Sequence, residues 1–203
     1  AYDFYYKGRE EYQNYISDNN DESLKKAEEY YFKALEYDST FARAYAGLAE
    51  IYWLNNYSSE FFTSSFMDSA LVLIDIALSY DDQLPEAYNF RGLYNYETGK
   101  FDLAIQEYDK ALKFNPNYWE AYLGKGRLYL FQAEVMDQAI QNLHQASLLH
   151  RGVQLPLILR NIALALQWAG FIEQANAYIQ EALNLDGDSA AYFFNMARSE
   201  RYR

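Results

Sequence analysis

The sequence contains no cysteine, only three prolines, and far fewer basic than acidic side chains. The absence of cysteine excludes a disulfide scaffold, a thiolate zinc site and a cysteine nucleophile. With 17 basic against 29 acidic residues, the chain lacks the clustered Lys and Arg that phosphate binding requires, so we expect no direct nucleic-acid binding. Because no apolar run approaches the roughly 18 residues of a membrane span, we also expect no membrane insertion.

Apolar residues, by contrast, are plentiful: 51% of the chain is hydrophobic and 19% is aromatic, including 22 tyrosines. This content excludes an intrinsically disordered chain, which lacks the apolar surface needed to offset the entropy of ordering. The chain begins with Ala1 and carries no signal peptide, so we expect a fragment or a processed form. We expect a cytoplasmic location, and a periplasmic or extracytoplasmic one stays open because the N-terminus is expected to be trimmed.

A short pattern of small, large and small residues recurs along the chain. Each copy has an alanine, a larger apolar residue four positions later and a second alanine three positions after that, so all three share one helix face. Successive first alanines are 43, 34, 35 and 36 residues apart, and this near-constant period predicts a helical repeat. The five triads are Ala27/Tyr31/Ala34, Ala70/Ile74/Ala77, Ala104/Tyr108/Ala111, Ala139/Leu143/Ala146 and Ala175/Ile179/Ala182.

A second helical stretch with a small residue of its own precedes each triad. Glycine inside a helix costs about 1 kcal/mol relative to alanine, so its recurrence predicts a helix crossing too close for a side chain. Between the paired helices, Gly99 and Gly170 are predicted to adopt the left-handed conformation that ends a helix. Pro85 and Pro156 occupy expected first helical positions. The five small residues are Gly8, Ala49, Gly92, Gly126 and Ala163.

The stretch Ala87-Tyr88…Arg91-Gly92…Gly99…Ala104…Tyr108…Ala111…Pro116 resembles a tetratricopeptide (TPR) repeat, which places these residue types at these spacings over 34 residues. The resemblance implies an all-α fold: a TPR-type right-handed superhelix of five helix-turn-helix repeats with a C-terminal capping helix, forming a single domain over 1–203. The expected repeats cover about 1–41, 42–84, 85–118, 119–155 and 156–188, and the capping helix about 189–200.

Departures from the repeat pattern fall between paired helices. We expect long connections around Asn14–Glu22 in the first repeat and Tyr57–Met67 in the second, and one extra residue near Ala133–Met136. The segment Tyr57–Phe66 contains three phenylalanines where a turn would be polar. Either it folds back and buries them, the favoured interpretation, or it exposes an apolar patch for a partner.

The resemblance to TPR domains also implies that the first helices line a concave groove that binds peptides. The expected lining is aromatic with interspersed arginines, which predicts a partner segment with apolar anchors and some negative charge. The alternative is that many of these aromatics pack between helices. The candidate groove residues are Tyr5, Arg9, Tyr12, Glu50, Trp53, Asn89, Leu93, Tyr96, Leu123, Arg127, Phe131, Arg160, Leu164 and Trp168.

We therefore expect a non-enzymatic protein–protein interaction scaffold that binds a peptide or helix of a partner, with no cofactor and no metal. His144 and His150 are six positions apart and do not share a helix face well enough to ligate one ion. A narrower resemblance, around Tyr6-Lys7-Gly8-Arg9 and Phe41–Ala49, favours an alternative: the sensory or oligomerisation region of a larger bacterial transcription regulator or signalling protein. Self-association stays open as a further role.

Overall fold

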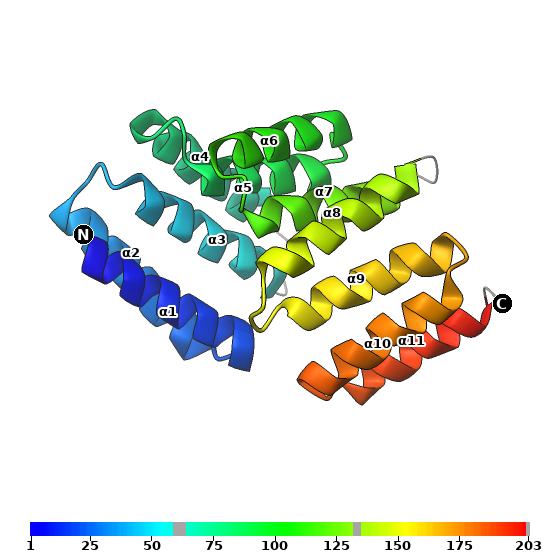
Figure 1. The fold of residues 1–203 in the computed structure, drawn as a ribbon. Coiled ribbons are helices and arrows are strands. Elements are labelled where there is room, and N and C mark those ends of the chain that lie inside the picture. The colour runs from blue at the N-terminus through cyan, green and yellow to red at the C-terminus, as the bar shows by residue number, and fades with distance from the viewer. Residues whose placement is uncertain (59–63, 132–134, 202–203) are drawn as a thin grey trace. The chain divides into compact units, whose positions relative to one another are not determined.

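The computed structural model describes residues 1–58, 64–131 and 135–201, and within these ranges the protein is built from eleven helices with no strand (Figure 1). The predicted all-α class is confirmed. The helices are α1 (Tyr2–Asp18), α2 (Asp21–Tyr37), α3 (Ala42–Ser58), α4 (Ser64–Tyr80), α5 (Pro85–Glu97), α6 (Phe101–Phe114), α7 (Trp119–Leu130), α8 (Met136–Leu149), α9 (Leu155–Trp168), α10 (Ile172–Asp186) and α11 (Ser189–Arg201). None of the described helices is both long and apolar enough to cross a bilayer.

The helices pack as consecutive pairs, and this helix-turn-helix arrangement is the predicted one. Each odd-numbered helix from α1 to α9 packs against the even-numbered helix that follows it, and α11 packs against α10 and α9. The first helices of neighbouring pairs also touch: α1 contacts α3, α3 contacts α5, and α7 contacts α9. These contacts bring positions from successive repeats onto a shared face.

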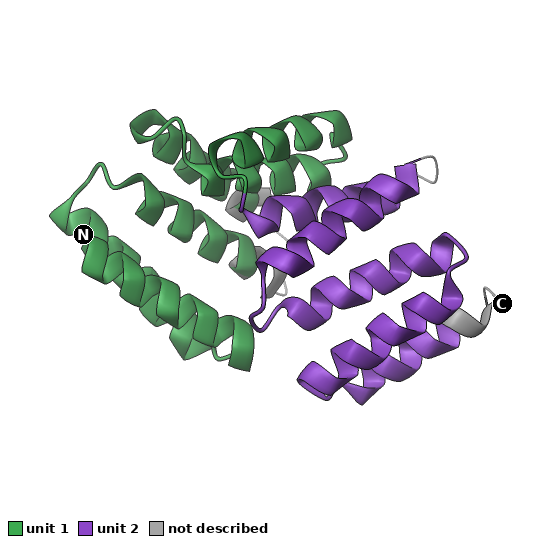
Figure 2. Ribbon diagram, viewed as in Figure 1, with its two compact units in different colours: residues 1–116 green, residues 117–203 purple. Residues whose placement is uncertain are grey.

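The chain divides into two compact units, which we call unit 1 (Ala1–Pro116, helices α1 to α6) and unit 2 (Asn117–Arg203, helices α7 to α11) (Figure 2). Each unit has apolar core clusters of its own. A single domain over 1–203 stays a prediction, and the two units are described separately below.

The five triads form the centres of the helix pairs, because every one of their side chains is at most 2% exposed. The small residue of the first helix lies directly against the large residue of the triad. A Cβ atom added at Gly8 would lie 2.6 Å from the Tyr31 ring, and one at Gly126 would lie 2.6 Å from Cγ of Leu143. The predicted close crossing is therefore confirmed, and at these sites glycine is required for helix contact rather than for backbone freedom.

The turns between paired helices follow the expected chemistry where the structure describes them. Gly99 and Gly170 end α5 and α9 with φ values of 73° and 84°, in the left-handed region that favours glycine. Pro85 is the first residue of α5 and Pro156 the second of α9, positions where the missing N–H has no intrahelical partner to lose.

The long connection expected around Asn14–Glu22 is wrong, because the additional residues lengthen both helices instead. Helices α1 and α2 are each 17 residues long and only Asn19 and Asn20 separate them. Asn19 ends α1 in the left-handed conformation, with a φ of 51°, and the Asn20 side chain accepts a hydrogen bond from the Glu22 backbone N–H at 3.0 Å. Two adjacent asparagines thus make a complete turn.

Two other departures cannot be compared with the structure in the same way. Helices α3 and α4 are also 17 residues long, but residues 59–63 between them are not described. The two interpretations of the phenylalanines in Tyr57–Phe66 therefore lie outside the described residues. The extra residue of the fourth repeat falls on 132–134, which lie outside them as well.

Candidate functional site

An ion pair lies in the middle of the unit 1 face formed by α1, α3 and α5. The Arg9 guanidinium donates to Oε2 of Glu50 at 3.0 Å and so joins α1 to α3. The two side chains are only 30% and 23% exposed. Burial raises the pKa of Glu50, and the Arg9 charge opposes that increase without cancelling it. Arg9 also lies 5.5 Å from the Tyr12 ring centroid, so its cation contacts an aromatic ring as well as the carboxylate.

The aromatic residues predicted for this face lie mostly between helices. Tyr5 is 7% exposed and meets the Phe41 ring edge-on at 5.4 Å, and its burial raises the pKa of the phenol to about 12. Trp53 is 8% exposed, and its ring meets the Phe90 ring edge-on at 5.7 Å. These contacts hold α1 against the start of α3, and α3 against α5.

The remaining unit 1 positions on α5, Asn89, Leu93 and Tyr96, are half-buried. The Tyr96 ring centroid lies 6.0 Å from that of Phe101, at the start of α6. A second pair of charges, which sequence reasoning missed, links α3 to α5: Arg43 and Glu86 approach to 4.0 Å. Arg43 is the second residue of α3 and Glu86 is the second residue of α5. Opposite charges at the same position of consecutive repeats could therefore have predicted this pair from the sequence.

In unit 2 the corresponding face is formed by α7 and α9 and has exposed aromatic rings. Phe131 directly follows α7 and is 68% exposed, while Trp168 ends α9 and is 37% exposed. Their ring centroids are 6.2 Å apart in an edge-on arrangement. An open pocket of about 380 Å³ lies beside them and is lined by Leu130, Phe131, Met136, Trp168 and Ala169. Sequence reasoning found its two aromatics and missed the other three residues.

Arg127 lies one helical turn before Phe131 on α7. Its side chain is exposed and has no hydrogen bond or ion pair with any other described residue. Leu164 directly follows Ala163 on α9, just as Glu50 directly follows Ala49 on α3, so Leu164 occupies in unit 2 the repeat position that Glu50 occupies in unit 1. Leu164 is half-buried on the unit 2 core and has no charge to offset the guanidinium.

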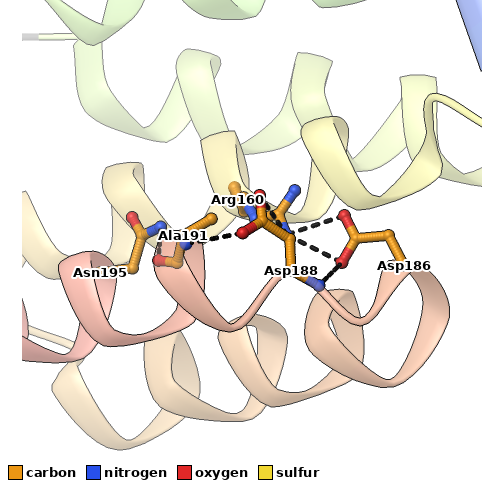
Figure 3. Close-up of polar contacts among 5 residues, drawn as sticks. All are labelled: Arg160, Asp186, Asp188, Ala191 and Asn195. Atoms are coloured by element: carbon orange, nitrogen blue, oxygen red, sulfur yellow. Dashed lines mark hydrogen bonds and ion pairs between the residues drawn. The ribbon is translucent and has the colours of Figure 1, made fainter. Parts of the chain in front are cut away.

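Arg160, the other candidate arginine of unit 2, is held by two carboxylates at the junction of α10 and α11 (Figure 3). Its guanidinium lies 2.8 Å from Asp186 and 4.0 Å from Asp188. Asp188 in turn accepts a hydrogen bond from the Ala191 backbone N–H at 3.0 Å, which caps α11. Arg160 therefore ties α9 to the start of the last helix.

A buried glutamine on α9 holds the C-terminal half of α11 in place. The Gln167 side chain is 1% exposed and donates to the backbone oxygen of Asn195 at 3.0 Å, while Nε of Arg198 donates to Oε1 of Gln167 at 2.8 Å.

No group of three or more His, Asp or Glu residues within the described ranges could hold a metal ion.

Comparisons with known proteins agree with this architecture. Residues 92–133 match the family of TPR repeats. The structure is similar to TTC0263, a thermophilic TPR protein of Thermus thermophilus, with a TM-score of 0.69 and 19% identity over 95% of this chain and 96% of that one. It is also similar to YrrB, described as a TPR protein with an unusual peptide-binding site, with a TM-score of 0.56 and 20% identity over 85% and 83% of the two chains.

A third similar structure is yeast Tom70, with a TM-score of 0.66 and 21% identity over 98% of this chain and 39% of that one. At these identities the likeness shows the fold alone. The comparisons lend no support to the narrower resemblance to regulators and signalling proteins. The chain therefore contains a TPR repeat over residues 92–133 and has the TPR-type fold of paired helices throughout the described residues.

Proposed function

We propose that this protein is a non-catalytic interaction module and that the face of α7 and α9 in unit 2 binds a segment of a partner protein. The observation that carries the proposal is the exposed pair of Phe131 and Trp168 beside an open pocket, with Arg127 one turn away. Large apolar side chains around a concavity usually mark a contact surface. Trp, Tyr and Arg are the residue types that most often dominate interface energy.

The fold gives general support, because TPR proteins are protein-interaction scaffolds. YrrB, which shares the fold, is described as having a peptide-binding site. Within this chain the unit 1 face is less suited to the same task. Its arginine is paired with Glu50, and Tyr5 and Trp53 are buried, so a ligand would find little free apolar surface or free charge at these positions.

The proposal is tested by affinity capture of partners from a lysate of the source cells. The whole protein is compared with two variants of the unit 2 face, Trp168→Ala and Arg127→Glu. Their matched controls are Leu148→Ala, which removes an exposed apolar side chain from α8, and Arg151→Glu, which reverses an exposed charge after α8. Circular dichroism is used to check that all four retain native helicity.

We expect the native protein and both controls to retain the same partner and the two face variants to lose it. Retention by all variants would contradict the proposed face. Trp53→Ala is unsuitable for this purpose, because the Trp53 ring is buried against Phe90 and its loss would disturb the packing of α3 on α5.

A further inference from the structure

The pocket of unit 2 has the size and lining of a site for one large apolar side chain. Its volume of about 380 Å³ lies at the lower end of the range for ligand pockets, roughly 300–1,000 Å³. Leu130 is 4% exposed and forms the buried part of the lining, whereas the rings of Phe131 and Trp168 are accessible. Met136 adds a flexible side chain that can adapt to an inserted group.

Arg127 determines which charge a bound segment should carry next to its apolar side chain. It has no partner among the described residues, so a carboxylate brought beside it would form a new charge-assisted pair, and the planar guanidinium suits bidentate contact. The exposed Asp137 follows the pocket residue Met136 in the first turn of α8 and would repel a carboxylate placed next to it. A carboxylate of the partner is therefore favoured next to Arg127 rather than next to Met136.

The net charges of the two units favour binding of an acidic segment to unit 2 rather than to unit 1. Residues 117–203 contain eight acidic and seven basic side chains, whereas residues 1–116 contain 21 acidic and ten basic ones. An acidic segment would be repelled by the field of unit 1 and would meet little net repulsion from unit 2.

The helix spacing sets the distance between the two features of the ligand. Arg127 and Phe131 are four residues apart, which corresponds to about 6 Å along α7. An extended segment advances about 3.3 Å per residue, so the carboxylate belongs about two residues from the apolar side chain.

We infer that unit 2 selects partner segments in which a large apolar side chain, aromatic or leucine-like, is separated by about two residues from an aspartate or glutamate. The apolar side chain fills the pocket and the carboxylate pairs with Arg127. This inference rests on the proposed function and adds the chemistry of the partner to it.

The test is selection of a random peptide library displayed on phage, carried out in parallel on the whole native protein and three variants. Arg127→Glu reverses the charge, Ala169→Leu fills the pocket, and Arg151→Glu is the matched control for charge. We expect the native protein and Arg151→Glu to enrich an apolar residue with Asp or Glu about two positions away. Arg127→Glu should enrich Lys or Arg at that position instead, and Ala169→Leu should lose the apolar preference.

A synthetic peptide of the enriched sequence then gives the magnitude. Its affinity, measured by fluorescence polarisation, should fall on the order of tenfold on Arg127→Glu, as expected for loss of one charge-assisted pair. Replacing its acidic residue by lysine should restore binding to that variant, which damaged folding could not imitate. Enriched peptides with no acidic preference, or with one that persists in Arg127→Glu, would overturn the inference and leave peptide binding intact. Failure to enrich any peptide would overturn peptide binding by this protein as well.

Discussion

Arg9 and Arg127 occupy the same position of the TPR repeat, yet the structure gives them opposite surroundings. Each directly follows the glycine that packs against its own second helix, Gly8 and Gly126. Arg9 in unit 1 meets Glu50 at 3.0 Å, whereas the position equivalent to Glu50 on α9 of unit 2 holds Leu164, and Arg127 has no ion pair with a described residue. We infer that this one residue on the neighbouring first helix determines whether the arginine pairs within the fold.

The aromatic residues divide in the same way. Tyr5 and Trp53 are buried between helices of unit 1, while Phe131 and Trp168 are exposed at the ends of helices in unit 2. These candidate positions thus carry similar residue types in both units, but their side chains are buried in unit 1 and exposed in unit 2. Aromatic and arginine side chains contribute to binding only where the fold leaves them uncovered and unpaired.

The largest effect is expected where the two units are alike, in the centres of the helix pairs. Ile74 in unit 1 and Leu143 in unit 2 are both fully buried, so replacing either by alanine should lower the free energy of unfolding by about 2–5 kcal/mol. Urea unfolding followed by circular dichroism measures both losses. A loss below about 1 kcal/mol for only one of them would show that the units are not packed on the same scheme.

A smaller loss is expected from Arg9→Gln, which leaves the carboxylate of Glu50 half-buried without its cation. The cost should be roughly 1–3 kcal/mol at neutral pH, measured by urea unfolding. Without Arg9 the pKa of Glu50 rises further above its ordinary 4.5, so the folded state binds the proton more tightly than the unfolded one. The loss should therefore shrink as the pH falls through the raised pKa. An equal loss at neutral and acidic pH would contradict this role of the pair.

Leu164→Glu should convert unit 2 to the arrangement of unit 1 by giving Arg127 a neighbour of opposite charge. Binding of an acidic peptide selected on the native protein should weaken on the order of tenfold, because the guanidinium is then paired internally. Leu164→Gln is the control, since it has nearly the same size and no charge. Fluorescence polarisation measures both affinities, and equal weakening by the two variants would show that the shape of Leu164, rather than the charge of Arg127, matters.

The smallest effects are expected in the pH dependence of stability, which should differ between the units. Burial lowers the pKa of His150 in unit 2 below 6.5, so the unfolded state binds the proton more readily and stability should fall as the pH drops below that value. Burial raises the pKa of Tyr5 in unit 1 to about 12, so stability should fall as the pH rises above about 10. His150→Gln should reduce the loss of stability just below pH 6.5, and Tyr5→Phe should reduce the alkaline loss, as measured by urea unfolding across pH. An unchanged pH profile in either variant would contradict these assignments.

The repeat architecture could be predicted from the sequence because it depends on local spacing. The triads and the small residues opposite them repeat with a nearly constant period, and Gly99 and Gly170 mark turns by a backbone conformation that glycine favours. The length of α1 and α2 could not be predicted in this way. A left-handed Asn19 followed by the capping Asn20 makes a two-residue turn. Asparagine is common in turns and loops of many lengths, so its presence does not predict so short a connection.

The candidate face could be predicted only as a set of positions. The resemblance to TPR repeats predicts that Arg9 and Arg127 share one face of the first helices, but the pairing of Arg9 depends on Glu50, 41 residues away. Opposite charges at equal positions of consecutive repeats were a usable signal for that pair. No comparable signal revealed that Arg160 is held by Asp186 and Asp188, because those carboxylates lie at the junction of α10 and α11 rather than at a repeat position.

The difference between the two arginines is tested most directly by measuring stability and peptide affinity on one matched pair of variants, Arg9→Gln and Arg127→Gln. The peptide is the one selected on the native protein. We predict that Arg9→Gln lowers the free energy of unfolding and retains peptide affinity, whereas Arg127→Gln weakens the affinity and changes stability by less than about 0.5 kcal/mol. A variant pair in which Arg9→Gln weakens binding and Arg127→Gln does not would contradict the assignment of structural and binding roles to the two units.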